Sequence, residues 1–282
     1  MEQAIRIVAD SSCDLLPEEV DAFEIEVAPL VVHFGTETYR DGELTVEEFW
    51  EKAAGPDLPH TSQPPVGVFD EIFERLVSRG AQVLCLTITG KHSGTFNAAR
   101  LAAQRFGERV QVFDSLSLSL GLGLQAQAAA RAARAGGSIQ EILDLLKGVR
   151  ERMRLTILLD TLENLRRGGR ADAFIALADR MTRALNIKVL VDVSEGQLQL
   201  LGAARSFKRG LRRMLEQAEK MGPLEQLAVL HTRSQEVAAE MADRLAERLG
   251  FSRERIYVRE TGAVLSAHAG KGVIAVLALP GA

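Results

Sequence analysis

The chain has 282 residues, of which 46% are hydrophobic and 26% are charged, and its formal net charge is −4 at pH 7. This ordinary globular balance provides no broad positive field, which argues against a protein that holds nucleic acid or an anionic membrane surface. Aromatic residues make up only 5% of the chain, so few side chains are available to stack on bases.

The two cysteines and the start of the chain indicate the compartment. Cys13 and Cys85 are too few for a disulfide framework, so a reducing environment is expected. The first residues lack the charged segment and long apolar run of a signal peptide. No apolar run reaches the roughly 18 residues that a membrane span needs. We therefore expect a cytoplasmic protein.

The first half of the chain alternates apolar strands with helical patterns. Strands are predicted at residues 5–9, 25–32, 83–88 and 110–113, and helices at residues 66–77, 93–106 and 120–135. Two further helices are predicted to begin at the capping boxes that start with Thr45 and Ser138. This alternation predicts βαβ units and a mostly parallel sheet.

The second half has a different order of elements. We predict strands at residues 155–159, 227–231, 256–259 and 273–279, and helices at 162–165, 173–185, 206–221 and 235–249. Residues 189–193 and 198–201 flank Glu195-Gly196 and predict a β-hairpin. The chain is thus predicted to be an α/β protein with two domains, residues 1–153 and 154–282.

Nucleotide and metal motifs are weak or missing in the sequence. Residues 121–126 match GxGxxA, but the second strand with an acidic residue that a dinucleotide site requires does not follow; a helix starting at Ser138 is predicted there instead. The sequence contains no GxxxxGK[ST], no HExxH and no paired zinc spacing, so nucleotide and metal hydrolysis lack their usual signals.

Two polar segments allow either a structural or a functional interpretation. Asp10-Ser11-Ser12-Cys13-Asp14 follows the first strand, where open α/β sheets bind ligands, but its side chains also suit a turn that caps backbone amides. The turn is the favoured interpretation. His60-Thr61-Ser62-Gln63-Pro64-Pro65 could be a plain helix entry or a rigid loop that directs a hydroxyl into a pocket.

Three further positions also have two interpretations. Ser93, in Ser93-Gly94-Thr95, could be an ordinary N-cap, a nucleophile, or a hydroxyl donor to an anion at a helix start. Arg170 follows Gly168-Gly169, which allow close approach of the backbone to a ligand, although most arginines are simply solvated. His268 could be a satisfied buried imidazole or a donor in a pocket.

Taken together, the order of these motifs resembles the DegV family of fatty-acid-binding proteins, along the whole chain. The matching segments are Asp10-Ser11-Ser12-Cys13-Asp14-Leu15, Thr61-Ser62-Gln63-Pro64, Ser93-Gly94-Thr95, Asp114-Ser115, Ser119-Leu120-Gly121, Leu162-Glu163-Asn164-Leu165-Arg166-Arg167-Gly168-Gly169-Arg170, Leu185-Asn186-Ile187-Lys188, Gly196-Gln197-Leu198, Ala204-Arg205-Ser206 and His268-Ala269-Gly270.

The resemblance implies a fold and a function. It implies a Rossmann-like, mostly parallel sheet in the first domain, a mixed sheet in the second α/β domain, and a ligand tunnel between the domains. It implies a carrier, not catalytic alone, that presents a long-chain fatty acid to a separate ATP-dependent fatty acid kinase for acyl phosphate formation. The fatty acid is then the ligand, and no cofactor or metal is expected.

The resemblance also implies residue roles. Thr61, Ser93 and His268 would bind the fatty acid carboxylate, and Arg170 would lie at the pocket mouth and support phosphoryl transfer. Ser62, Gly94, Thr95 and Ser115 are further candidates for the pocket lining.

The sequence departs from the family pattern at three positions, and an alternative function stays open. Val189 and Lys271 stand where the family usually has proline, and Pro65 stands where serine is common. The alternative is a small-molecule enzyme, either a serine hydrolase that uses Ser93 with His92 or His268, or a sugar-type kinase.

Overall fold

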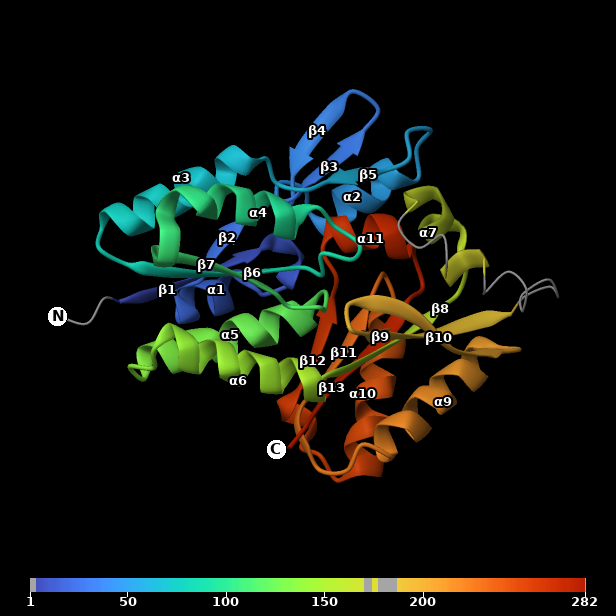
Figure 1. Cartoon of the computed structure of the whole chain (residues 1–282). Coiled ribbons are helices and arrows are strands. Elements are labelled where there is room, and N and C mark those ends of the chain that lie inside the picture. The colour runs from blue at the N-terminus through green and yellow to red at the C-terminus, as the bar shows by residue number, and fades with distance from the viewer. Residues whose placement is uncertain (1–3, 170–173, 177–186, 282) are drawn as a thin grey trace. The chain divides into compact units, whose positions relative to one another are not determined.

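The computed structural model describes residues 4–169, 174–176 and 187–281 (Figure 1). By its internal contacts the chain divides into two compact units. The first comprises Met1–Glu151 with Gly262–Val264, and the second comprises Arg152–Thr261 with Leu265–Ala282. In the described ranges, no helix has both the length and the hydropathy to cross a membrane.

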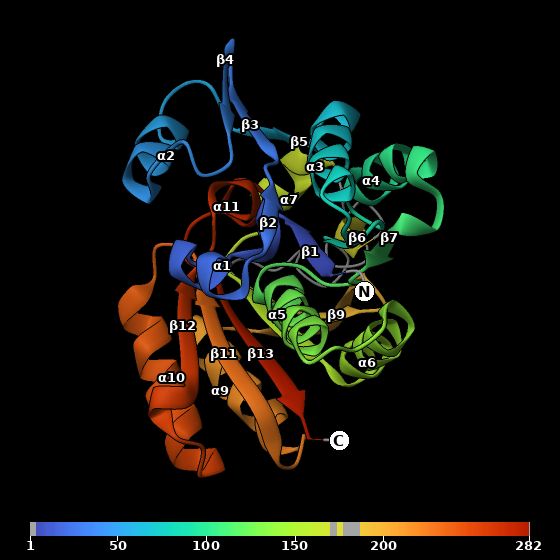
Figure 2. The same ribbon diagram turned by 90° about the vertical axis from the view of Figure 1, so that its left-hand side faces the viewer.

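The first unit contains a four-stranded, fully parallel sheet with the order β2-β1-β6-β7. Its strands are β1 (Ile5–Asp10), β2 (Glu26–Ala28), β6 (Gln82–Thr87) and β7 (Val110–Asp114). Helices cover both faces, namely α3 (Val66–Ser78) and α4 (Thr95–Ala103) on one and α5 (Leu120–Arg134) and α6 (Ile139–Arg152) on the other (Figures 1 and 2). The predicted mostly parallel sheet is confirmed.

Burial on both faces explains why these strands are continuously apolar. In β6, Leu84 and Leu86 pack in one core cluster with α5 and α6, while Val83 and Cys85 pack in another with α3 and α4. Successive side chains of a strand point to opposite faces, so a strand between two helical layers needs apolar residues at every position.

The predicted single strand at residues 25–32 is wrong. The structure has two strands there, β2 in the parallel sheet and β3 (Val31–Phe34) in a separate antiparallel sheet. Pro29 lies between them and has no N–H to donate to a ladder, so the chain leaves the first sheet at this point. The second sheet has the order β4-β3-β5, with β4 (Glu37–Arg40) and β5 (His60–Ser62), and was not predicted.

The second unit is built on a six-stranded mixed sheet with the order β10-β9-β8-β13-β11-β12. Among the strand pairs that the structure describes in this sheet, only β11 and β12 run parallel. The strands are β8 (Arg154–Leu159), β9 (Lys188–Ser194), β10 (Gln197–Ala204), β11 (Leu224–His231), β12 (Ile256–Glu260) and β13 (Ile274–Pro280). The predicted hairpin is confirmed, with Glu195 and Gly196 both at positive φ in its turn.

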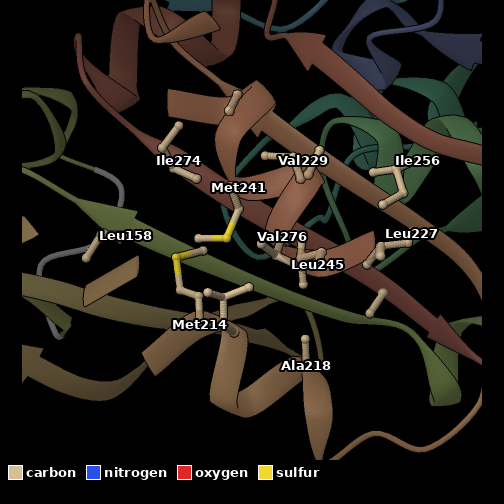
Figure 3. Packing of buried hydrophobic residues seen from close by; sticks show 14 of the residues in the cluster. Leu158, Met214, Ala218, Leu227, Val229, Met241, Leu245, Ile256, Ile274 and Val276 are labelled. Atoms are coloured by element: carbon tan, nitrogen blue, oxygen red, sulfur yellow. The ribbon is translucent and has the colours of Figure 1, made fainter. Parts of the chain in front are cut away.

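Two helices, α9 (Phe207–Glu219) and α10 (Gln235–Leu249), cover one face of this sheet. Met214 of α9 and Met241 of α10 point toward each other over Leu158 and Ile274 of the sheet (Figure 3). The flexible thioethers fill the space where the two helices meet.

The remaining helices were predicted unevenly. The helices α2 (Val46–Ala53) and α6 start at the predicted capping boxes. The helix predicted at 93–106 is shorter than expected, because α4 ends at Ala103 and a 3-10 segment (Gln104–Arg109) follows. Most of the helix predicted at 173–185 lies outside the described residues. Three helices were identified less well from the sequence: α1 (Pro17–Phe23) and α11 (Ala263–Ala269) were missed, and α7 (Glu163–Gly168) was predicted too early.

Gly123 of α5, within the GxGxxA match, allows the helix to pack closely on the segment after β1. A β-carbon placed on Gly123 would lie 2.5 Å from the carbonyl oxygen of Cys13. Gly123→Ala should therefore lower the free energy of unfolding by about 1–3 kcal/mol, the usual cost of overpacking a core. Chemical denaturation measures this. The control is Gly148→Ala in α6, where nothing lies within 4 Å of the added carbon, and we expect a gain of about 0.5–1 kcal/mol there. Equal effects of the two substitutions would contradict this packing role.

Candidate functional site

The polar segment after β1 lies at the carboxyl edge of the parallel sheet, and its side chains hold backbone. Asp10 is fully buried; its Oδ1 accepts a hydrogen bond from the amide of Ser12 (3.1 Å) and its Oδ2 from the amide of Ile88 (2.6 Å). The carboxylate thus ties the end of β1 to the end of β6. The turn interpretation of this segment is therefore the one that fits its contacts.

Burial dominates the electrostatics of Asp10. It raises the pKa of this carboxyl to about 6, against the lowering effect of the hydrogen bonds from Ser12 and Ile88. Burial also raises the pKa of Asp41, which accepts a hydrogen bond from Ser11 Oγ (2.7 Å). Burial raises the pKa values of the Cys13 and Cys85 thiols as well, so neither is an activated nucleophile.

The segment Thr61–Pro64 and the segment Ser93–Thr95 lie against each other within the first unit. Strand β5 carries Thr61, which pairs with Val32 of β3, and Gln63 follows directly. A β-carbon on Gly94 would lie 1.8 Å from Gln63 Oε1, so the Gln63 side chain occupies the space that any larger residue at position 94 would need. Thr61 and Ser62 are both partly exposed, and Ser62 Oγ is 2.9 Å from His33 Nε2.

Ser93 lies two residues before the first residue of α4, Thr95. Its hydroxyl lies 2.8 Å from Thr95 Oγ1 and accepts a hydrogen bond from the Thr95 amide (3.3 Å). Ser93 is half-buried and Thr95 is fully buried. Both of these hydrogen bonds go to Thr95, which is not a general base, so the hydroxyl is not that of an activated nucleophile. The N-cap interpretation of Ser93 is wrong, because the N-cap of α4 is Gly94, and the Ser93 hydroxyl instead holds the turn that leads into the helix.

Ser115 is also fully buried, but its hydroxyl is used in its own turn. Its Oγ accepts from the amide of Ser117 (3.1 Å) and donates to the Ser117 carbonyl (3.3 Å). Asp114, just before it, accepts from the amides of Gly90 (3.1 Å) and Leu116 (3.0 Å). These contacts fix the loop after β7 and the loop that leads to Ser93.

The second unit brings together two other predicted motifs. His268 lies in the last turn of α11, and a β-carbon on Gly168 would lie 2.5 Å from its Nδ1. Two residues later, a β-carbon on Gly270 would lie 1.7 Å from Asn164 Nδ2. The end of α11 thus packs on α7 through glycines, and the imidazole lies beside the Gly168-Gly169 break.

Two predicted positions remain, Arg170 and Lys271. Arg170 lies outside the described residues. Lys271 is exposed, between Gly270 and Gly272, which both have positive φ. Among the residues that the structure describes, no group of three or more His, Cys, Asp or Glu side chains is arranged to hold a metal ion.

The sequence did not predict several contacts around Ser93 and around α11. The Gln63–Gly94 contact, the role of Asp41 and the existence of α11 were not predicted. No periodicity marks a helix of seven residues, and no local pattern marks a contact between residues 31 positions apart.

A family model described as "Uncharacterised protein, DegV family" matches residues 4–281. The chain belongs to the DegV family. The family resemblance of the motifs is thereby confirmed. A DegV domain-containing protein of Deinococcus radiodurans is 36% identical over 287 residues, covering 98% of this chain and 99% of the relative.

Solved structures of DegV proteins share the whole fold. The DegV family protein of Thermus thermophilus, described as binding fatty acid, has 30% identity and a TM-score of 0.89, and covers 99% of this chain and 100% of its own. DegV of Bacillus subtilis, described as a fatty acid binding protein, has 28% identity and a TM-score of 0.86, covering 98% and 99%. The two-domain DegV fold class is confirmed.

The raised pKa of Asp10 has a measurable consequence. The folded protein binds this proton more tightly than the unfolded chain, so the contribution of Asp10 to stability is fully present below the unfolded pKa of 3.8 and is lost as the pH rises through 6. The free energy of unfolding of wild type relative to Asp10→Asn should fall by about 2 kcal/mol between pH 4 and pH 7. Urea denaturation at several pH values measures this difference. A difference that stays constant with pH would contradict the shifted pKa.

Proposed function

We propose that this chain binds one long-chain fatty acid and presents its carboxylate to a separate, ATP-dependent kinase that forms the acyl phosphate. The observation that carries fatty acid binding is the match over 99% of the chain to a fatty-acid-binding DegV protein at 30% identity. The kinase step rests on the family resemblance, which ties the arginine of Gly168-Gly169-Arg170 to phosphoryl transfer.

We assign the carboxylate to Thr61, Ser93 and His268. A carboxylate taken out of water needs several donors, or it becomes protonated. Two hydroxyls and an imidazole provide donors, and only the imidazole can carry a positive charge. Because no permanently charged side chain pairs with the carboxylate, its oxygen would stay reactive toward a phosphoryl donor.

The acyl chain would supply most of the binding free energy. Burying about 15 methylenes at ~0.8 kcal/mol each gives roughly 12 kcal/mol before the costs of association. The apolar tail therefore sets the affinity and chain-length preference, while the donors set the orientation of the headgroup.

The alternative of a serine hydrolase receives less support. A nucleophilic serine needs a base within hydrogen-bonding reach, and the hydroxyl of Ser93 bonds to Thr95 instead. A sugar-type kinase would need its own nucleotide site, for which the sequence has no motif.

The carboxylate assignment can be tested by substitution. Ser93→Ala and Thr61→Ala should each weaken oleate binding by at least roughly tenfold, because a hydrogen bond to a charged group is worth about 1.5–3 kcal/mol. Fluorescence titration of delipidated protein measures the affinity. Ser138→Ala is the matched control. It removes a hydroxyl that accepts a hydrogen bond from the amide of Glu141 at the start of α6. Wild-type affinity in both test variants would refute the assignment.

The kinase step makes a separate prediction. The fatty-acid-loaded chain should form no acyl phosphate with ATP alone and should form it when a DegV-associated kinase is added. Arg170→Ala should retain oleate affinity but lose transfer, because we assign Arg170 to phosphoryl transfer rather than to the headgroup. Reaction with hydroxylamine converts the acyl phosphate to a hydroxamate, whose amount is measured. ATP-dependent product from the chain alone would contradict the carrier role.

A further inference from the structure

The start of α11 is held by two carboxylates of the first unit. Oδ1 of Asp14 accepts a hydrogen bond from the amide of Gly262 (2.8 Å), and Asp41 accepts one from the amide of Val264. A β-carbon on Gly262 would lie 3.1 Å from Asp14 Oδ1 and 3.7 Å from Asp41 Oδ1, so Gly262 stands close to both. The first amides of a helix have no partner within it, and negative charge favours that end.

Both carboxylates are themselves fixed by other parts of the first unit. Asp14 has a left-handed backbone (φ 50°), and its Oδ2 accepts a hydrogen bond from Ser119, the residue before α5. Asp41 accepts from Ser11 Oγ, which in turn accepts from the amide of Leu30 (3.0 Å). These contacts give each carboxylate a single position rather than the freedom of a surface side chain.

The helix α11 links this anchor to His268 over a short distance. By their contacts, residues Gly262–Val264 belong to the first unit, whereas the residues before Gly262 and after Val264 belong to the second. The helix has seven residues, begins at Ala263 and carries His268 in its last turn. From Val264 to His268 is about one turn, a rise of roughly 6 Å. A shift or rotation of the first turn therefore moves the imidazole.

We propose that Asp14 and Asp41 are positioning residues for His268. By fixing the first turn of α11 they set where the imidazole stands when it binds the fatty acid carboxylate. This inference rests on the proposed function, because it takes His268 to be a carboxylate donor. Neither aspartate is assigned a contact with the ligand.

A purely structural role would predict something different. If the two aspartates only stabilised the fold, their loss would lower affinity by the same factor whether or not His268 was present. If they act through His268, their loss should matter only while the imidazole is there, because coupled residues give non-additive effects in a double-mutant cycle.

The experiment is that cycle, read by oleate titration of the delipidated full chain. Asp14→Ala and Asp41→Ala should each weaken oleate binding roughly tenfold in the wild-type background, about the loss of one hydrogen bond to the carboxylate. In the His268→Ala background each should change affinity by less than about twofold. The control is Glu141→Ala, which removes a carboxylate that accepts the amide of Ser138 (2.8 Å) at the start of α6, and should leave affinity unchanged.

A second measurement keeps the test independent of ligand binding. In the ligand-free protein, the imidazole NMR resonances of His268 should shift in Asp14→Ala and in the milder Gly262→Ala, and stay in place in Glu141→Ala. Equal affinity losses in both backgrounds, or unmoved His268 resonances, would overturn the positioning role. If wild type fails to bind oleate, the proposed function fails, while the resonances still decide whether the aspartates position His268.

Discussion

Four carboxylates determine how the loops of the first unit are held. Asp10 and Asp114 are the last residues of strands β1 and β7 and accept hydrogen bonds from loop amides. Asp14 and Asp41 do the same for the start of α11. Buried amides without partners are costly, and these loops have no ladder to satisfy them. The conformation around Ser93 and that of Gly262–Val264 both depend on this arrangement.

The carboxylates and the proposed ligand donors have different partners. The carboxylates bind the chain's own amides, and the residues that we assign to the fatty acid headgroup, Thr61, Ser93 and His268, are hydroxyls and an imidazole. A ligand carboxylate placed near an aspartate would be repelled and its pKa raised, so hydroxyls and an imidazole suit the proposed headgroup site better than acidic side chains do.

The sequence predicted the elements with strong periodicity and missed the short ones. Buried strands such as β6 and capped helices such as α6 carry local signals, and they appear where expected. The small antiparallel sheet has strands of three or four residues with polar positions, and Pro29 redirected the chain within one apolar run. Short elements of this kind depend on tertiary contacts rather than on their own pattern.

The candidate site was predicted residue by residue through family resemblance, and its internal geometry was not. The order of motifs gives no reason for Gln63 to lie on Gly94 or for Gly168 to lie beside His268. Asp14 and Gly262 are 248 positions apart, and only the folded chain brings that carboxylate to that amide. Contacts of this range depend on the whole topology, so a local pattern cannot reveal them.

The central claim, that the chain carries one fatty acid, is tested most directly by native mass spectrometry of the purified protein. We predict a complex whose excess mass equals a single long-chain fatty acid, lost on delipidation and regained when oleate is added. A chain that appears only at its bare mass, before and after addition of oleate, would contradict the claim.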